Sequence, residues 1–237
     1  MSRGFAVYLK NFVPFSVLSL IFLSPTYIHA LASGGVDPLT GSGAGDFTVG
    51  GIAVTIAQLL LTYVLMATLA YGTFQELRGR HTTLGDCIGR GLSLLFPTLG
   101  VAILAAMAVG VGVILLIIPG IIAATMLWVA IPVAVVERPG VMASLSRSRH
   151  LTKGYRWHVL GIIIIFLIIN FVAVFIGAFV GSLASMATGS TTVNLLFESI
   201  VSALLTGLYA VIVSVGYHDL RVTNEGIDIK QIAAVFD

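Results

Sequence analysis

The chain alternates long apolar stretches with short polar ones. Six apolar stretches stand out, at residues of about 11–32, 51–74, 92–118, 120–136, 157–183 and 194–217. A helix of about 20 apolar residues crosses the ~30 Å hydrocarbon core of a bilayer, and a helix satisfies its own backbone hydrogen bonds there. The pattern therefore predicts an all-α, polytopic membrane bundle of six transmembrane helices that forms a single domain over residues 1–237.

The composition fits a chain that is solvated by lipid. Hydrophobic residues make up 58% of the chain and charged residues only 9%, whereas a soluble domain carries roughly 25% charged residues. A chain of this kind lacks the polar surface that a water-facing globule needs. The six stretches also take up more than half of the chain, which leaves no room for an independent soluble domain.

The basic residues are distributed unevenly along the chain. All twelve Lys and Arg residues fall in four segments, 1–10, 76–90, 137–156 and 217–237. No basic residue occurs in the connections around 33–50, 118–121 and 184–193. Positive charge resists translocation, so cytoplasmic loops retain Lys and Arg. Six spans would place all four basic segments and both termini in the cytoplasm. A second interpretation takes Ala30-Leu31-Ala32 as a signal-peptidase site, which would leave five spans in the same orientation.

Three of the basic segments contain a short, weakly amphipathic stretch that leads into an apolar one. These stretches are residues 3–10, 87–92 and 145–154. A helix of this type lies in the membrane interface with its apolar side down. The chain therefore fits three helix-hairpin repeats, each made of an interfacial helix and two spans. Shared topology constraints are the alternative explanation, because the spacing between the three copies is irregular.

Prolines and glycines mark predicted turns, kinks and contacts. Pro119-Gly120 predicts a tight turn between two spans, since Pro fixes φ and Gly permits positive φ. Pro97 and Pro132 predict kinks within their helices. Gly177 and Gly181 form a G-x-x-x-G pattern, which lets two helices approach closely, either within the chain or in an oligomer.

Three polar side chains lie within apolar stretches and are candidate intramembrane sites. Glu198 is the one acidic residue there, and a carboxylate in a membrane is costly unless it has a partner. Asn194, one helical turn away, is a suitable partner. Asn170 and Gln58 are amides in mid-span positions, where we expect hydrogen bonds across helices, and each is a candidate partner for the other.

The sequence contains no recognisable catalytic or metal-binding motif. Its histidines have no carboxylate or second His at metal-ligand spacing. No Walker loop, nucleophile elbow or dinucleotide fingerprint occurs. Cys87 is the single cysteine, so an internal disulfide is excluded and a small buried residue is expected. The basic residues are few and adjacent to the membrane, which argues against nucleic-acid binding. We therefore expect no catalytic residue, metal or cofactor.

The segment Val136-Glu137-Arg138-Pro139-Gly140-Val141, followed by residues 143–154 (ASLSRSRHLTKG), carries a family resemblance. With Ile118-Pro119-Gly120 before it and Trp157 after it, this string resembles a family of bacterial six-span proteins. That family includes the membrane domain that accompanies some glycerophosphoryl diester phosphodiesterases. The resemblance covers most of the chain, but only this stretch is specific. It implies a cytoplasmic helix between the fourth and fifth spans, and a bacterial cytoplasmic (inner) membrane.

The resemblance does not bring the catalytic activity with it. The associated phosphodiesterase uses a soluble barrel with a His-Arg pair and metal-binding acids. This chain has no His-Arg dipeptide and no room for a barrel. What the resemblance implies is a membrane module that works near lipid headgroups.

The sequence thus predicts a non-catalytic membrane module, either a lipid-associated scaffold or an accessory subunit of a membrane complex. Its expected partners are membrane lipids or another membrane protein. The residues expected to contact phosphate headgroups or an acidic partner are Arg147, Arg149, Lys153 and Arg156. The first alternative is a transporter or channel lined by Glu198, Asn170 and Gln58. The second is a membrane enzyme of lipid metabolism, although the spans lack a paired acid and base. The oligomeric state is left open.

Overall fold

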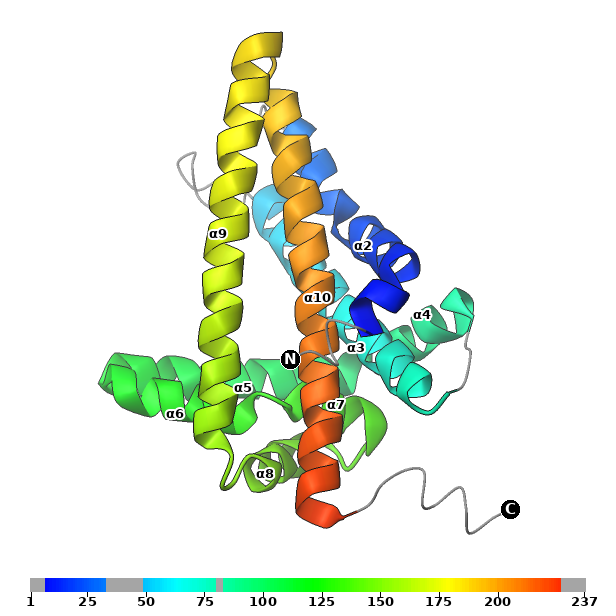
Figure 1. Ribbon diagram of the computed structural model, residues 1–237, viewed down its shortest axis with the longest axis vertical. Coiled ribbons are helices and arrows are strands. Elements are labelled where there is room, and N and C mark those ends of the chain that lie inside the picture. Colours follow the sequence, from blue (N-terminus) through cyan, green and yellow to red (C-terminus); the bar gives the residue numbers. More distant parts are fainter. Residues whose placement is uncertain (1–6, 33–48, 80–82, 227–237) are drawn as a thin grey trace.

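A computed structural model describes residues 7–32, 49–79 and 83–226, and every regular element in these ranges is a helix. In chain order the helices are α2 (Phe12–Ala32), α3 (Val49–Leu77), α4 (Leu84–Ser93), α5 (Leu95–Leu115), α6 (Ile117–Leu127), α7 (Ala130–Val136), α8 (Val141–Leu151), α9 (Arg156–Thr188) and α10 (Thr191–Glu225) (Figure 1). The predicted all-α fold is confirmed.

Five stretches of the described chain are long and apolar enough to cross a membrane. They are Ile56–Leu77, Leu95–Leu115, Ile117–Val136, Arg156–Thr188 and Thr192–Glu225. The first predicted span corresponds to α2, whose described apolar part is shorter, Phe12–Pro25. Helix α2 packs against α3 and α10 within the bundle. The chain is a multi-pass membrane protein.

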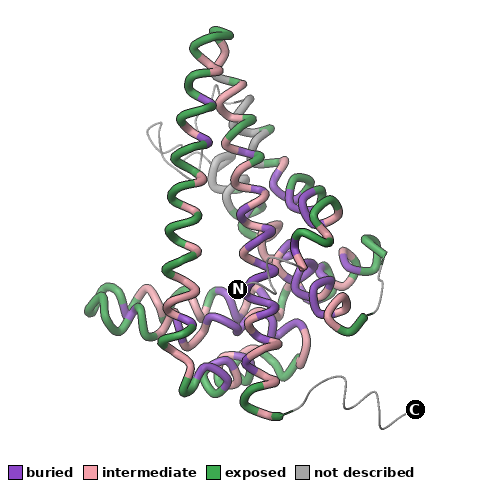
Figure 2. Tube along the Cα trace, in the orientation of Figure 1, coloured by how far each residue is buried: buried purple, intermediate pink, exposed green. Residues whose placement is uncertain are grey.

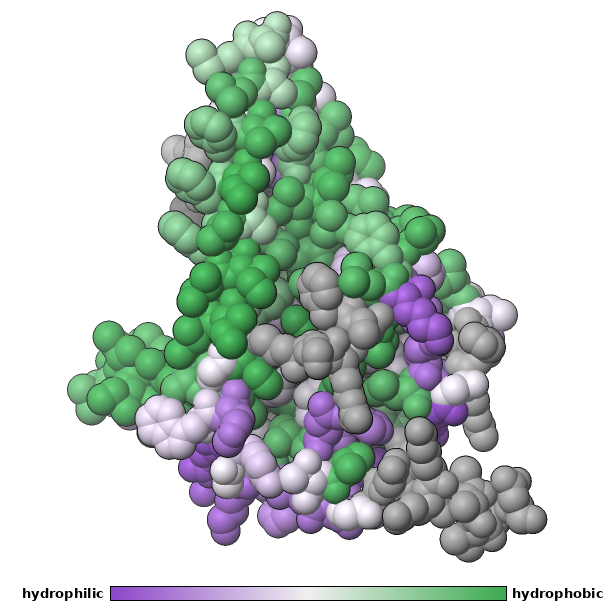
Figure 3. Space-filling model, viewed as in Figure 1, coloured by the Kyte–Doolittle hydropathy of each residue, from purple (hydrophilic) through white to green (hydrophobic). Residues whose placement is uncertain are grey.

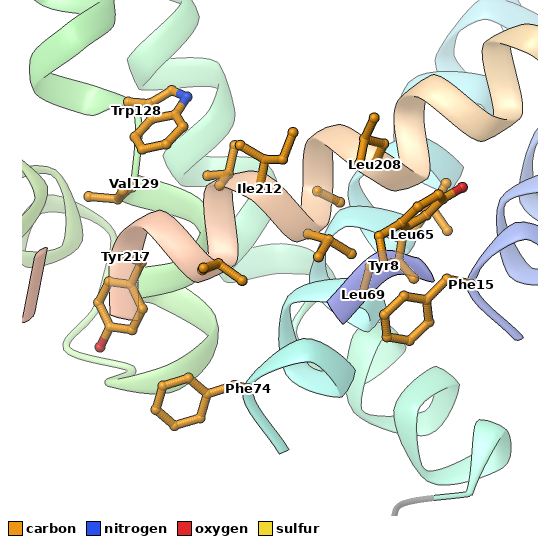
Figure 4. Close-up of a cluster of buried hydrophobic side chains, with 14 of the residues drawn as sticks. Tyr8, Phe15, Leu65, Leu69, Phe74, Trp128, Val129, Leu208, Ile212 and Tyr217 are labelled. Atoms are coloured by element: carbon orange, nitrogen blue, oxygen red, sulfur yellow. The ribbon is translucent and has the colours of Figure 1, made fainter. Parts of the chain in front are cut away.

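Helix α10 runs through the centre of the molecule. Its buried residues meet side chains from α2, α3 and the connection between α6 and α7 (Figure 4). Tyr8, just before α2, donates a hydrogen bond to the carbonyl of Leu204, with 3.1 Å between oxygens. Helix α9 differs, because most of its residues are exposed along its whole length (Figure 2). An apolar helix with so little protein cover must be solvated by lipid.

Helices α9 and α10 pack closely at two buried glycines of α9. A Cβ atom placed on Gly181 would lie 2.4 Å from Asn194 Oδ1, and one on Gly177 would lie 3.0 Å from Val201 Cγ2. Both partners belong to α10. The G-x-x-x-G pattern therefore serves a contact within the chain, where the missing side chains let the two helices approach.

The predicted turn at Pro119-Gly120 was wrong by a few residues. Helix α5 ends at Leu115, Leu116 is extended (φ −164°, ψ 140°), and α6 begins at Ile117. Pro119 therefore lies in the first turn of α6, where its missing N–H has no helical acceptor to bond. The two helices form a hairpin that is tight at Gly112 and Gly120, because a Cβ atom on Gly112 would lie 2.8 Å from the Cα of Gly120 and one on Gly120 would lie 2.7 Å from the N of Val113.

The predicted kinks at Pro97 and Pro132 are helix boundaries instead. Each proline is the third residue of a new helix, α5 or α7. The predicted span 92–118 begins inside α4, which ends at Ser93, and the span 120–136 is divided at Trp128 and Val129. Proline is tolerated in a first turn and disrupts a helix interior, so the chain breaks just before it.

Short helices precede longer ones as the sequence predicted. Residues 7–10 are helical ahead of α2, α4 precedes α5, and α8 precedes α9. The order of short helix and hairpin thus recurs, but the hairpins differ in direction. Helices α5 and α6 run across the long axis of α9 and α10 in Figure 1. The three-repeat interpretation stays a prediction.

Candidate functional site: the basic helix α8

Helix α8 is held against the base of the α5–α6 hairpin by its serine face. Ser144, Ser148 and Leu151 are buried, and α8 packs on α5, α6 and α7. The hydroxyl of Ser148 donates to the carbonyl of Met126 at 2.8 Å, and that of Thr152 donates to the same oxygen at 3.3 Å. Helix α6 ends one residue later, so these hydroxyls satisfy a carbonyl that the helix break sets free.

The turn before α8 depends on an unusual backbone. Gly140 has φ 94° and Arg138 has φ 52°, a region that non-glycine residues rarely adopt. The turn brings Glu137, at the end of α7, back over α8. Arg147 of α8 donates to this carboxylate twice through Nε, at 2.9 Å and 3.2 Å, and once through Nη2 at 3.2 Å.

Arg147 links two carboxylates that are distant in the sequence. Its Nη2 also donates to Glu225 in the last turn of α10. Arg221 donates to the other oxygen of Glu225 at 3.2 Å, and the hydroxyl of Tyr217 donates to Glu137 at 2.8 Å. We call these five residues the α8–α10 ion network. Two cations and two carboxylates make it neutral, and it fastens α8 to the end of α10.

The two carboxylates of the network stabilise the charge of Arg147. Hydrogen bonds to Glu137 raise the pKa of Arg147 above its usual value, and Glu225 acts in the same direction. A guanidinium is charged near neutral pH in any case, so the network adds a stable pairing to a charge that is already there. Its side chain is only 27% exposed, and those of its two carboxylate partners are 19% and 21% exposed. Arg147 is half-buried against its two carboxylate partners.

The other predicted contact residues are placed differently from Arg147. Arg149 and Lys153 are exposed on the outer side of α8 and the turn that follows, beside exposed His150. Neither cation forms an ion pair with any residue in the described part of the chain. Arg156 is half-buried at the start of α9, and its buried Nε has no hydrogen-bond partner among the described residues. The structure thus separates an internal cation, Arg147, from an outer basic face, Arg149 and Lys153.

Sequence reasoning missed Glu137, Tyr217, Arg221 and Glu225 as a structural unit. A usable signal was present, since Tyr217, Arg221 and Glu225 recur at intervals of four residues and so share one helix face. Their partners belong to other elements, at the end of α7 and on α8, and helical periodicity relates only residues within one helix.

The three intramembrane candidates lie on three different helices. Glu198 on α10 accepts a hydrogen bond from Asn194 at 3.0 Å, as predicted. Gln58 on α3 is buried, and its Oε1 has no partner among the described residues. Asn170 on α9 is half-buried. No hydrogen bond joins Asn170 and Gln58 within the described ranges, because α9 packs on α10 rather than on α3. That predicted pairing was wrong.

A recess lies between the start of α9 and the end of α10. It has a volume of about 180 Å³ and a mostly apolar lining, to which Trp128, Tyr155 and Ile212 contribute. His158 and Asp219 are polar members of the lining. Tyr155 follows Lys153 by two residues, so the lining of the recess continues in sequence from the outer basic face. No group of three or more His, Cys, Asp or Glu side chains that could hold a metal occurs in residues 7–32, 49–79 and 83–226.

Comparison of the chain with models of protein families, with curated protein sequences and with solved structures found no match.

Proposed function

We propose that this protein is a non-catalytic membrane module that binds anionic lipid headgroups through the outer basic face of α8. The observation that carries the proposal is the contrast between Arg147, whose charge is neutralised inside the protein, and Arg149 and Lys153, whose charges face outward without a partner in the described chain. A cation near an anionic membrane surface gains about 1 kcal/mol. The face therefore attracts phosphate groups.

The surroundings of α8 suit a lipid. Figure 3 shows polar side chains gathered at one end of the molecule and a continuous apolar surface beyond them. Basic groups of α8 belong to this polar end, next to the apolar recess at α9. A phosphate bound at the basic face would leave its acyl chains beside apolar protein. We further propose, from the distribution of Lys and Arg, that this end is cytoplasmic in a bacterial inner membrane.

An accessory role fits this arrangement better than transport or catalysis. Glu198 accepts a hydrogen bond from Asn194. The three intramembrane candidates lie on α10, α9 and α3, and no hydrogen bond joins any two of them in the described residues. The family resemblance of residues 136–154 supports the same role, since that segment is α8 and its approach. An acidic surface on a partner protein is the competing occupant, which the following test distinguishes.

The test uses the intrinsic fluorescence of Trp157. This side chain is 83% exposed at the start of α9, four residues from Lys153, whereas Trp128 is buried. The protein is reconstituted into vesicles that contain brominated phosphatidylglycerol or brominated phosphatidylcholine, and quenching is compared. We expect stronger quenching by the anionic lipid. Because each cation contributes about 1 kcal/mol, the double variant Arg149→Gln/Lys153→Gln should lower the preference by roughly 30-fold.

A charge-matched control is the double variant Lys10→Gln/Arg90→Gln, which removes two cations from other segments. Its lipid preference should match that of the wild type. If the wild type shows no preference for the anionic lipid, or if both double variants lower it equally, α8 is not a headgroup site. Unchanged quenching in the α8 variant, with loss of a co-purifying acidic protein, would assign the face to a protein partner.

A further inference from the structure

The tip of the α5–α6 hairpin is made of exposed aliphatic side chains. Ile114, Leu115, Leu116, Ile117 and Ile118 are 69–85% exposed. No charged residue occurs between Gly91 and Val136. A hairpin that crossed the membrane would present this tip to the headgroups or water of the opposite face. A patch of large aliphatic side chains is unfavourable there and favourable in hydrocarbon.

The hairpin is built as a rigid arm. Gly112 and Gly120 bring the two helices into backbone contact near the tip. At the base, Val141 of α8 packs on Gly100, where a Cβ atom would lie 3.1 Å from Val141 Cγ2. The bonds from Ser148 and Thr152 to Met126 fasten the other helix. The direction of the arm is therefore set by contacts at both of its helices.

That direction is incompatible with a hairpin that crosses the membrane beside α9 and α10. The arm runs across the long axis of α9 and α10 (Figure 1). At 1.5 Å per residue, the 33 residues of α9 extend about 50 Å, more than the ~30 Å hydrocarbon core. The 21 residues of α5 extend only about 32 Å, so they would have to stand nearly upright to cross. If α5 stood upright, α9 would lie along the membrane, because the two helices run across one another in Figure 1, yet α9 is the most apolar of the candidate spans in the described chain.

The arm also lies at a defined level of the bilayer. Helix α8 packs on both α5 and α6, and the outer side of α8 carries Arg149 and Lys153. An interfacial helix keeps its charges at the headgroups and its buried side toward the acyl chains. The base of the arm is thus held just below the headgroups of the basic face.

We infer that the α5–α6 hairpin is an in-plane arm, embedded in the leaflet on the basic side and surrounded by its acyl chains. Its length and composition would allow a crossing, but its attachment directs it along the membrane. The arm increases the footprint of the protein in one leaflet only. This inference does not depend on headgroup binding by α8, since acyl chains of zwitterionic lipids would solvate the arm equally.

The test measures the depth of the tip in the bilayer. In a Cys87→Ser background, a single spin-labelled cysteine is placed at Leu116, with a second tip variant, Ile118→Cys, in case the first does not fold. The references are Met142→Cys on α8, Ile168→Cys in the middle of α9 and Met186→Cys near its far end. All are exposed positions. Power saturation with oxygen and a polar nickel complex gives each depth in reconstituted vesicles.

We expect the tip label to lie between the depths of the Met142 and Ile168 labels. Before spin labelling, a membrane-impermeant maleimide should fail to reach the tip cysteine from either side of sealed vesicles, while it reaches the Met186 cysteine from one side. Labelling of the tip from the side that labels Met186, or a depth beyond Ile168, would show a spanning hairpin and overturn the inference. Labelling from the Met142 side would also overturn it, because the arm would then lie in water.

Discussion

Arg147→Gln is expected to lower the free energy of unfolding by about 1–3 kcal/mol, the cost of leaving buried polar groups without their partner. The substitution removes the link between Glu137 and Glu225, which lie on separate elements, α7 and α10. A fully buried pair would cost more, about 3–5 kcal/mol, but the side chains here keep some contact with solvent. Thermal unfolding in detergent micelles, followed by circular dichroism, measures the effect.

Arg149→Gln is the matched control for Arg147→Gln. It removes the same charge two residues further along the same helix, where the side chain is exposed, so stability should change by less than about 0.5 kcal/mol. A double-mutant cycle of Arg147→Gln and Glu225→Gln should give a coupling free energy of roughly 0.5–3 kcal/mol, as for residues in one network. Equal effects of the two Arg substitutions, or no coupling, would contradict a structural role for the network.

Gly112→Ala is expected to destabilise the protein by about 1–3 kcal/mol, the usual cost of overpacking. The new methyl group would lie 2.8 Å from Gly120 Cα and 2.9 Å from Gly120 N. These are backbone atoms of the facing helix, which cannot rotate out of the way, so the hairpin would have to open. The same thermal unfolding measurement applies.

Gly110→Ala provides the opposite expectation on the same helix. A Cβ atom at Gly110 meets nothing within 4 Å, and Ala is favoured over Gly in a helix by up to about 1 kcal/mol. Its stability should be unchanged or higher. If Gly112→Ala were as stable as Gly110→Ala, the close approach of α5 and α6 would be incorrect.

The length of an apolar stretch predicted the position of a helix where that helix is apolar along most of its length. The predicted span 157–183 lies within α9, because nothing in that stretch interrupts the helix. The predicted span 194–217 also lies within a longer helix, since α10 continues to Glu225. Its last turns are polar, and apolar periodicity does not detect them. They are helical because Arg221 and Glu225 bind within the ion network and Asn224 donates to the carbonyl of Leu151 at 2.9 Å.

The sequence predicted which segment holds the candidate site, but not which of its basic side chains face outward. The density of basic residues in 137–156 pointed to α8, and that segment is where the described charges gather. The sequence could not tell that Arg147 faces inward while Arg149 and Lys153 face outward. Which side chains face outward depends on which face of α8 packs on the hairpin. That face is set by tertiary contacts such as the hydrogen bond from Ser148 to the carbonyl of Met126. The course of the α5–α6 hairpin was unpredictable for the same reason. An apolar hairpin has the same composition whether it crosses the membrane or lies along it, and only its tertiary contacts set its direction.

We propose that the basic end of this membrane protein is cytoplasmic. The most direct measurement is the sidedness of two cysteines, Met142→Cys on α8 and Met186→Cys near the far end of α9, in the Cys87→Ser background. An impermeant maleimide is applied to spheroplasts and to inverted membrane vesicles of a bacterial host. We expect Met142→Cys to react only in inverted vesicles and Met186→Cys only in spheroplasts. Reaction of both cysteines from the same face, or the reverse pattern, would contradict it.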